Sequence, residues 1–538
     1  MTERCKICYR TAAEWETNTL DEHLANAHRD DPMSVKAVYA EAHDRLFDDD
    51  GVVDADVGGG DDDEAQTDDE ADETADERTA PDLADTTYGK KWYVIGVGGA
   101  GNNIVDAILL RRRTLDERDA DRAYIWQGGL AGYGMLNTNI SELEQTYYAS
   151  EVKQYVRNDL LSNTLIGMGG HDGTGMGYRW DTGAKVVEYD FEGEKNAFRD
   201  RWDLRPQEIR DSQAVMFVHS VTKGTGCGST PVLAEKLREH VLPDDTIVGK
   251  PVLSSVVLPS QGSELSRQGG RPKTNGVVGL ARLSQAVDAV IPFTNDRLER
   301  AEGDIHPEIA DLTKYNPPQY ASLNRPLVAY LEAFTLTSTP QLLSQEHDIR
   351  AKGDVFDVSD SFRPAQDKYP ASIPLDETPA VVLAPVLGRL RGSEMTESSL
   401  DLLVRNTLLQ NKLADFDPST AWGGQFLVYG PDSKMERIRR HVTDGTMQEI
   451  LNREEFLDGA NTDSVETVDV QISQLSVPYL DDVYLWGALW NPEMPALESM
   501  YEHARDIKEG GSRQGESLRE VWPHVESLFD CLGRENMA

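Results

Sequence analysis

The chain of 538 residues lacks any run of about 18 apolar residues, and its beginning, MTERCKICYR, lacks an apolar signal core. We therefore expect neither a membrane span nor secretion. The four cysteines are too few and too scattered for a disulfide framework, which fits a reduced cytoplasm. Basic residues number only 53 against 94 acidic ones, for a formal charge of -41. Because nucleic-acid binding needs a basic surface, nucleic acid is not an expected partner.

Lysine is scarce even among the basic residues, at roughly 17 of the 53. A uniformly acidic, lysine-poor surface is typical of a protein that works in concentrated salt, where self-repulsion is screened. The sequence therefore favours a halophilic protein, with an ordinary acidic protein as the alternative. The length predicts about three domains, or two domains with tails.

Acidic residues gather in one low-complexity segment near the beginning of the chain. Between Asp48 and Asp85 there are about 18 acidic residues and a single arginine. Such a composition cannot bury enough apolar surface to offset the entropy of ordering, so residues 48–88 are predicted to be a disordered linker.

Cysteine and histidine residues before this linker have the spacing of a zinc site. Cys5 and Cys8 are separated by two residues, and His23 and His28 by four. Two thiolates on a turn and two imidazoles one helical turn apart can complete a tetrahedron around Zn²⁺, and a module this small needs such a staple. Residues 1–47 are predicted to be a zinc-finger-like module. Because acid beside it would repel phosphates, its expected partner is a protein; the alternative is a coincidental pattern in a disordered head.

From Lys91 onward, strand-like apolar runs alternate with helical patterns, which predicts an α/β fold with a parallel sheet and helices on both faces. The later runs are expected to form a second α/β or α+β layer. The expected strands are residues 92–97, 214–221, 247–259, 286–293, 379–390, 425–430, 465–473 and 483–490.

A glycine-rich loop follows the first of these strands. Glycines allow the backbone to approach a phosphate, and the N-terminus of the next helix favours negative charge. The loop also fits a nicotinamide-dependent oxidoreductase. A dinucleotide site of that kind has an acidic residue at the end of the second strand to bind the ribose, and residues 135–139 contain none. The oxidoreductase is therefore the least favoured alternative. The candidate binding residues of this loop are Gly98, Gly99, Ala100, Gly101 and Asn102.

A second strand, residues 214–221, also runs into a glycine loop and a helix. A third glycine-rich stretch, residues 167–175, lies between the two loops. Three such loops suit a nucleoside triphosphate better than a single pyrophosphate, and the absence of G-x-x-x-x-G-K followed by Ser or Thr excludes a P-loop protein. The candidate residues of the second loop are Gly224, Thr225, Gly226, Cys227 and Gly228.

These motifs together resemble the tubulin/FtsZ superfamily of GTPases, over roughly residues 91–390. YVIGVGGAGNNIV and GMLNTNISEL, which includes Asn137, resemble its first nucleotide loops, and KGTGCGS resembles its signature loop. That loop departs from the family form twice: Lys223 replaces a glycine and Cys227 a smaller residue. IPFTNDRLERAE and YASLNRPLV are similar to the family's base-contacting segments. The resemblance implies that the amides of Asn295 and Asn324 contact guanine and that Tyr320 stacks on it; a helix cap and a shared helix face are the structural alternatives.

In this superfamily an acidic loop of one subunit completes the active site of the next. The segment VFDVSD aligns with the family form, so Asp357 and Asp360 match its two acids. Asp354 offers another register, and a solvated acidic turn is the alternative. An aspartate in this role orients or deprotonates a water, while Mg²⁺ and backbone amides neutralise charge.

The resemblance implies a Rossmann-like GTP-binding domain at residues 89–315, a central helix and catalytic loop at 316–374, and an activation-type α/β domain at 375–538. The expected function is a cytoplasmic, cytoskeletal GTPase that hydrolyses GTP to GDP at the junctions of a homopolymer. A non-polymerising regulatory or adaptor protein of the same fold is the alternative. The expected cofactors are GTP or GDP, Mg²⁺ and Zn²⁺.

Overall fold

The chain divides into two units, residues 1–79 and 80–538, and every residue that the computed structural model describes lies in the second. The predicted zinc ligands Cys5, Cys8, His23 and His28 and the acidic linker lie outside the described residues. The described residues are 90–118, 129–146, 165–167, 170–193, 196–200, 202, 204–242, 249–259, 270–301, 321–337, 349–352, 356–370, 373, 378–390, 397–441, 449–453, 456–457, 469–478, 480–510 and 512–533.

Five parallel strands form the first part of the sheet, in the order β2-β1-β3-β4-β5. They are β1 (Trp92–Val97), β2 (Leu130–Leu136), β3 (Ala214–Ser220), β4 (Val252–Leu258) and β5 (Ala289–Thr294). β1, β3, β4 and β5 are mostly apolar and are buried along almost their whole length, as expected of parallel strands that are covered on both faces. This confirms the predicted α/β fold with a parallel core.

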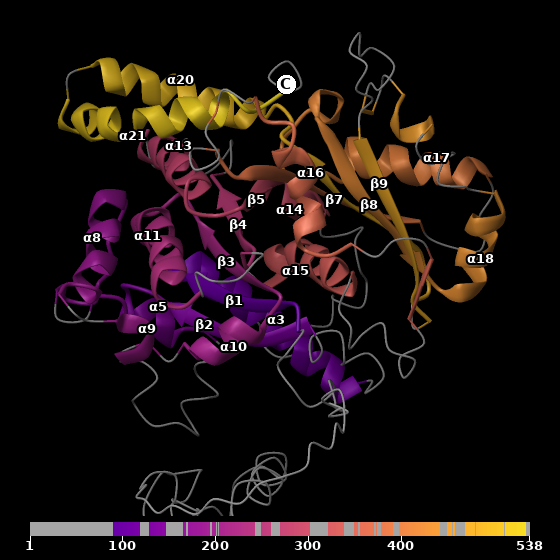
Figure 1. Cartoon of the computed structure of the whole chain (residues 1–538), viewed down its shortest axis with the longest axis horizontal. Helices are drawn as coiled ribbons and strands as arrows, with labels where there is room; N and C mark the ends of the chain where they lie inside the picture. The colour runs from indigo at the N-terminus through magenta and orange to yellow at the C-terminus, as the bar shows by residue number, and fades with distance from the viewer. Residues whose placement is uncertain are drawn as a thin grey trace, which may run out of the picture. The chain divides into compact units, whose positions relative to one another are not determined.

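The sheet continues without a break into five further strands, in the order β7-β10-β8-β9-β6 (Figure 1). They are β6 (Arg350–Lys352), β7 (Val381–Leu390), β8 (Gly423–Gly430), β9 (Asp469–Ser476) and β10 (Val483–Trp490). β7 joins β5 in parallel, whereas β10 runs antiparallel to both β7 and β8. Each of the eight expected runs contains a strand within its described residues. The described strands before and after the predicted boundary at residue 375 therefore belong to one sheet. The limits of the domains stay a prediction.

Side chains of β1 alternate between two core layers, as the period of a strand requires. Trp92 and Val94 pack on the side of α3 and α15, whereas Tyr93 and Ile95 pack on the side of α8, α11 and α13. Figure 1 shows the C-terminal pair α20 and α21 lying against α13. The long helices are α3 (Gly98–Arg118), α8 (Trp180–Asp190), α11 (Gly224–His240), α13 (Arg271–Ser284), α15 (Ala321–Leu336), α17 (Glu397–Arg405), α18 (Asp432–His441), α20 (Pro495–Glu509) and α21 (Arg513–Phe529).

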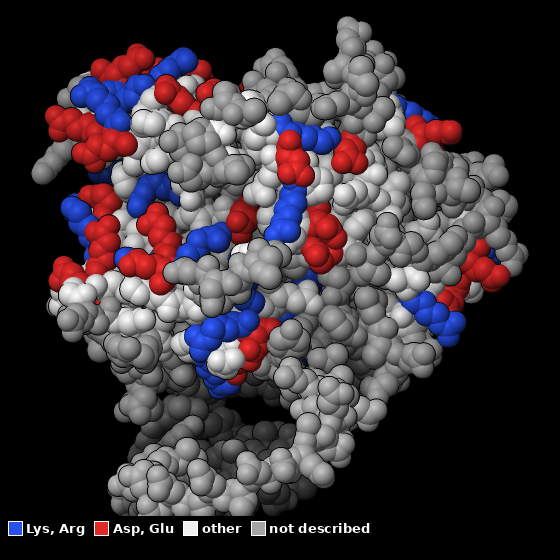
Figure 2. Space-filling model, in the orientation of Figure 1, with Lys and Arg blue, Asp and Glu red and all other residues white. Residues whose placement is uncertain are grey.

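Among the described residues, no helix has both the length and the apolar composition needed to cross a bilayer. Figure 2 shows acidic and basic side chains interspersed over α8, α20 and α21, so charge on these helices is not sorted by sign.

Short helical turns connect the strands and the long helices. They are α5 (Ile140–Glu144), α9 (Ala197–Asp200), α10 (Pro206–Asp211), α14 (Asn295–Ala301), η4 (Ser359–Ser361), α16 (Arg363–Gln366), η6 (Asn406–Gln410) and η7 (Pro418–Thr420).

A buried ion pair joins α3 to the central helix α15. Arg111 Nε donates to Glu332 Oε2 at 2.9 Å, and Arg111 Nη2 donates to Glu332 Oε1 at 3.0 Å. The two side chains are only 5% and 9% exposed. This two-point contact fixes the helix that begins at the first glycine loop against the helix that carries Asn324.

Removing one partner of such a pair leaves a charge unpaired in the core, at a cost of about 3–5 kcal/mol. We expect Arg111→Ala to lower the free energy of unfolding by about that amount, as measured by urea denaturation in high salt. The double variant Arg111→Met with Glu332→Leu removes both charges and should recover most of the loss. A single variant as stable as the wild type would contradict the expectation.

Candidate nucleotide-binding site

The two predicted glycine loops meet at the carboxyl ends of β1 and β3. These strands are parallel neighbours, with Val97 opposite His219. Gly98 has a φ of 72°, a conformation that favours glycine, and a Cβ placed on it would lie 3.3 Å from the backbone nitrogen of Gly226. The same Cβ would lie 3.5 Å from Thr225 Cβ. The loops are therefore in contact, each at the N-terminus of a helix.

Other glycines of the loops serve the packing of the helices. A Cβ on Gly101 would collide with the carbonyl oxygen of Val218, and one on Gly226 would lie 2.5 Å from that of Ser220. One on Gly228 would collide with the carbonyl oxygen of Trp180. These glycines were predicted only to bind phosphate. The structure adds a second reason for them, because α3 and α11 could not otherwise approach β3 and α8 so closely.

Asn102, in the first turn of α3, has a side chain with unmet hydrogen-bonding capacity. It is fully buried, and neither its Oδ1 nor its Nδ2 has a partner in the described protein. A buried amide without partners destabilises a fold by about 1–3 kcal/mol, so a bound water or ligand usually satisfies such a group. The position therefore fits a polar ligand held at the N-terminus of α3.

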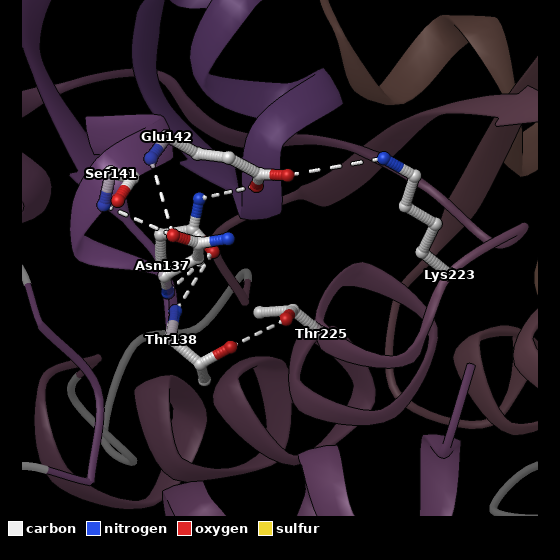
Figure 3. A network of polar contacts seen from close by, with 7 residues as sticks. Asn137, Thr138, Ser141, Glu142, Lys223 and Thr225 are labelled. Carbon is white, nitrogen blue, oxygen red and sulfur yellow. Dashed lines mark hydrogen bonds and ion pairs between the residues drawn. The ribbon is translucent and has the colours of Figure 1, made fainter. Parts of the chain in front are cut away.

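The loop after β2 is tied to the second glycine loop (Figure 3). Asn137 Oδ1 accepts from the backbone N–H groups of Thr138 at 2.8 Å and Asn139 at 3.2 Å. Thr138 Oγ1 and Thr225 Oγ1 share a hydrogen bond of 2.7 Å. Asn139 caps α5 by accepting from two of its backbone N–H groups. Asn137 thus shapes the turn that brings β2 to the site.

The third glycine-rich stretch also reaches this place, so all three loops gather at one edge of the sheet. The backbone N–H of Gly175 donates to the carbonyl oxygen of Thr138 at 3.1 Å, and that of Gly224 donates to Gly177 at 2.7 Å. Met168 and Gly169 lie outside the described residues.

Sequence reasoning missed Glu142, which lies in the middle of the site. Asn137 Nδ2 donates to Glu142 Oε2 at 3.0 Å, and Lys223 Nζ lies 3.9 Å from Glu142 Oε1 (Figure 3). A Cβ on Gly99 would lie 2.5 Å from Glu142 Oε2, so the carboxylate rests against the first turn of α3. The only signal in the sequence was the unusual Lys223, and nothing there pairs it with Glu142.

Cys227 turns its side chain away from the loop. The thiol donates to the carbonyl oxygen of Asn275 in α13 at 3.2 Å. Burial raises the pKa of the Cys227 thiol to about 12, so the side chain stays protonated. The thiol is therefore not available to a phosphate, and the backbone N–H of Cys227 donates to the carbonyl oxygen of Lys223 at 3.3 Å.

The predicted base-contacting residues lie on the elements after β5. Asn295 is the first residue of α14, directly at the carboxyl end of β5, and it is half-buried. Asn324 is buried in α15, which packs against α14. Tyr320 lies outside the described residues. β5 is two strands away from β3, so Asn295 lies about 10 Å along the same edge from the second glycine loop.

Asp357 and Asp360 form a closed turn at the opposite end of the sheet. The backbone N–H of Asp357 donates to Asp360 Oδ2 at 2.8 Å, and that of Asp360 donates to Asp357 Oδ1 at 2.9 Å. Burial lowers the pKa of Lys91 well below its usual value, and the two carboxylates oppose this shift. Trp490 Nε1 donates to the carbonyl oxygen of Ser361, next to this turn, and Trp490 pairs with Leu383 near the beginning of β7, which is parallel to β5. The turn therefore lies at the amino end of the parallel strands, about 20 Å, one strand length, from the edge that carries the glycine loops. Asp354 lies outside the described residues.

Metal ligands of the usual kind do not cluster in the described part of the chain. No group of three or more His, Cys, Asp and Glu side chains there could hold an ion. The zinc module at residues 1–47 stays a prediction, because its ligands lie outside that part.

Two neighbouring glycines should respond differently to an added methyl group. Gly98→Ala forces an alanine into a positive φ, which costs about 1–2 kcal/mol, and crowds Gly226. Gly99→Ala meets only the flexible end of Glu142, which can move away. We expect the first variant to lose about 1–2 kcal/mol of stability in urea denaturation and the second markedly less. Equal losses would mean that the Glu142 carboxylate is held rigidly.

Residues 91–302 match the sequence profile described as Tubulin/FtsZ family, GTPase domain. The tubulin-like protein CetZ of Pyrococcus abyssi is 37% identical over 82 residues, 15% of this chain and 20% of the relative. The tubulin-like protein CetZ3 of Haloferax volcanii is 28% identical over 228 residues, 41% of this chain and 49% of the relative. The chain thus spans from a fifth to about half the length of these relatives.

Solved structures resemble the fold over a longer stretch. The GDP-bound monomer of CetZ1 from Haloferax volcanii has a TM-score of 0.50 at 19% identity, covering 78% of this chain and 99% of that one. The GTPγS-bound protofilament of CetZ2 from the same organism has a TM-score of 0.51 at 18% identity, covering 78% and 100%. The chain therefore has the tubulin/FtsZ fold, and its residues 91–302 are similar to the GTPase domain of that family.

Proposed function

We propose that this protein binds GTP and GDP at the carboxyl edge of β1, β2 and β3 and hydrolyses GTP at the junctions of a filament of its own copies. One observation carries the binding proposal: two glycine loops in contact at two helix N-termini, beside the buried and unpartnered amide of Asn102. The GDP and GTPγS named for CetZ1 and CetZ2, and the protofilament of CetZ2, support it.

The backbone of both loops would hold the phosphates. The free N–H groups at the N-termini of α3 and α11 favour an anion. In α3 the residues Gly98 to Gly101 would supply them, with the side-chain amide of Asn102 as a further donor. In α11 they would come from Thr225 and Gly226, because the N–H of Gly224 donates to Gly177 and that of Cys227 donates to Lys223. GTP supplies the phosphoanhydride bond that is cleaved, and Mg²⁺ would neutralise part of its charge.

Guanine would be recognised from the β5 side of the site. Asn295 and Asn324 can each present both a donor and an acceptor to the edge of a base, and Tyr320 can stack on its face. A site built to hydrogen-bond guanine leaves its own polar groups unpaired when adenine enters, which is a strong basis for discrimination.

We expect GTP to displace a fluorescent GDP analogue at concentrations far below those of ATP. Asn324→Ala keeps a good helix former in α15 but removes the amide, so GTP binding should weaken by about tenfold or more. ATP binding to the same variant serves as the control and should change little. Equal competition by ATP and GTP in the wild type would rule out guanine recognition.

Hydrolysis would need a second copy of the chain, because Asp357 and Asp360 lie far from the glycine loops of their own subunit. A head-to-tail contact would bring the amino edge of one sheet to the carboxyl edge of the next and would repeat into a filament. An aspartate there would orient a water or take its proton.

Asparagine in place of either aspartate keeps an acceptor oxygen for the reciprocal hydrogen bonds of the turn but removes the charge. We expect Asp357→Asn or Asp360→Asn to retain GTP binding, to reduce turnover by about 10²-fold or more, and to give longer-lived filaments. Wild-type turnover per molecule should rise with protein concentration. Asp354→Asn is tested in parallel, since the register of the loop is open.

The non-polymerising regulatory or adaptor protein is the second candidate, on the strength of the predicted zinc module. Light scattering in high salt separates the two proposals, because only a polymer scatters more when GTP is added. Turnover that does not depend on concentration, or full activity in all three aspartate variants, would favour the adaptor. The oxidoreductase gains no support from the family match.

A further inference from the structure

The Glu142 carboxylate occupies a position that favours an anion. It rests against Gly99 in the first turn of α3, where the backbone N–H groups have no partner within the helix. The positive end of the helix dipole stabilises a negative charge there. A phosphate would be attracted by the same groups, so the carboxylate and a phosphate would compete for one place.

Lys223 supplies the opposite charge at the rim. It is the residue directly before α11, its side chain is 65% exposed, and its Nζ lies 3.9 Å from Glu142 Oε1. The tubulin/FtsZ signature resembled by this loop has a glycine there, which carries no charge. Exposed ion pairs contribute only about 0–1 kcal/mol, so Lys223 can leave Glu142 readily for a more highly charged partner.

The place of this pair along the sheet indicates which phosphate it meets; this step rests on the proposed binding of GTP. The base side of the site is at β5, and the strand order runs from β5 through β4, β3 and β1 to β2 at the edge. Glu142 belongs to α5, directly after β2. A nucleotide whose base lies near β5 would therefore point its terminal phosphate towards Glu142 and Lys223.

We propose that Glu142 and Lys223 are a specificity-determining pair that reads the terminal phosphate of a nucleoside triphosphate. The carboxylate must leave the N-terminus of α3 when this phosphate enters, and Lys223 exchanges the carboxylate for a phosphate oxygen. Glu142 weakens triphosphate binding and Lys223 strengthens it, whereas a diphosphate, which is shorter by one phosphoryl group, is affected much less.

The test is calorimetric titration of the full chain with GTPγS and with GDP, which measures affinity without turnover. Glu142→Gln is nearly isosteric and keeps the contact with Asn137. We expect it to tighten GTPγS binding about fivefold and to change GDP binding less than about twofold. We expect Lys223→Met to weaken GTPγS binding about tenfold with little effect on GDP. The loss of GTPγS affinity caused by Lys223→Met should be larger in the Glu142→Gln background. There Lys223 does not have to break an ion pair with a carboxylate before it contacts the phosphate.

Matched controls separate the pair from the general charge of the chain. Glu144 is an exposed acid on the same short helix, and Lys185 is an exposed base on α8. Glu144→Gln and Lys185→Met change the net charge by the same amounts and should shift the two affinities equally and only slightly. Thermal unfolding of each variant checks that the fold is kept.

Three results would overturn the proposal. Equal effects of Glu142→Gln on GTPγS and GDP would make the pair a structural contact only. In a second outcome, Glu142→Gln would instead weaken GTPγS binding in the presence of Mg²⁺ and have no effect once the metal is chelated. That result would make Glu142 a metal ligand. Binding of neither nucleotide by the wild type would remove the proposed function and this proposal together, an outcome distinct from the first two.

Discussion

The parallel pairing of β1 with β3 sets the distance between the two glycine loops. Both strands end at the same edge, and each is followed at once by a helix, so two helix N-termini are forced together. That crowding is possible only where side chains are missing: Gly101 lies against Val218, and Gly226 against Ser220. The geometry that would hold phosphates is therefore the same geometry that packs the helices, and the two cannot vary independently.

The two ends of β1 carry different buried polar groups. At the amino end, Lys91 Nζ donates to the carbonyl oxygens of Phe334 at 2.7 Å and Thr337 at 2.5 Å, which ties the strand to the end of α15. At the carboxyl end, the amide of Asn102 has no partner among the residues that the structure describes. A buried polar group that is satisfied stabilises the fold, whereas one that is not satisfied points to a ligand. One strand thus links the glycine loops to the acidic turn, whose carboxylates act on Lys91.

Much of the fold could be predicted because its causes are local. An apolar run between turn residues favours a buried strand, and a strand followed by glycines and a helix favours an anion site. The joining of β5 to β7 could not be predicted, because it depends on the pairing of strands far apart in sequence. Glu142 was missed for a similar reason. Its carboxylate reaches Gly99 only because Asn139 caps α5 and sets the direction of that helix.

The two departures of the second glycine loop from its family form have different physical consequences. Cys227 is buried, and a glycine in α13, Gly279, leaves room for its sulfur; a Cβ there would lie 2.7 Å from Sγ. The space beside Gly279 therefore accommodates the larger side chain of Cys227, and the thiol points away from the loop. Lys223 is exposed, so no packing compensates for it, and its charge acts on whatever lies at the rim of the site. Neighbouring residues can compensate for a substitution inside the core, whereas a charged substitution at the mouth of a site changes which ligands the site attracts. Lys223 and its carboxylate partner are therefore the place where this chain departs most in charge from the signature loop that it resembles.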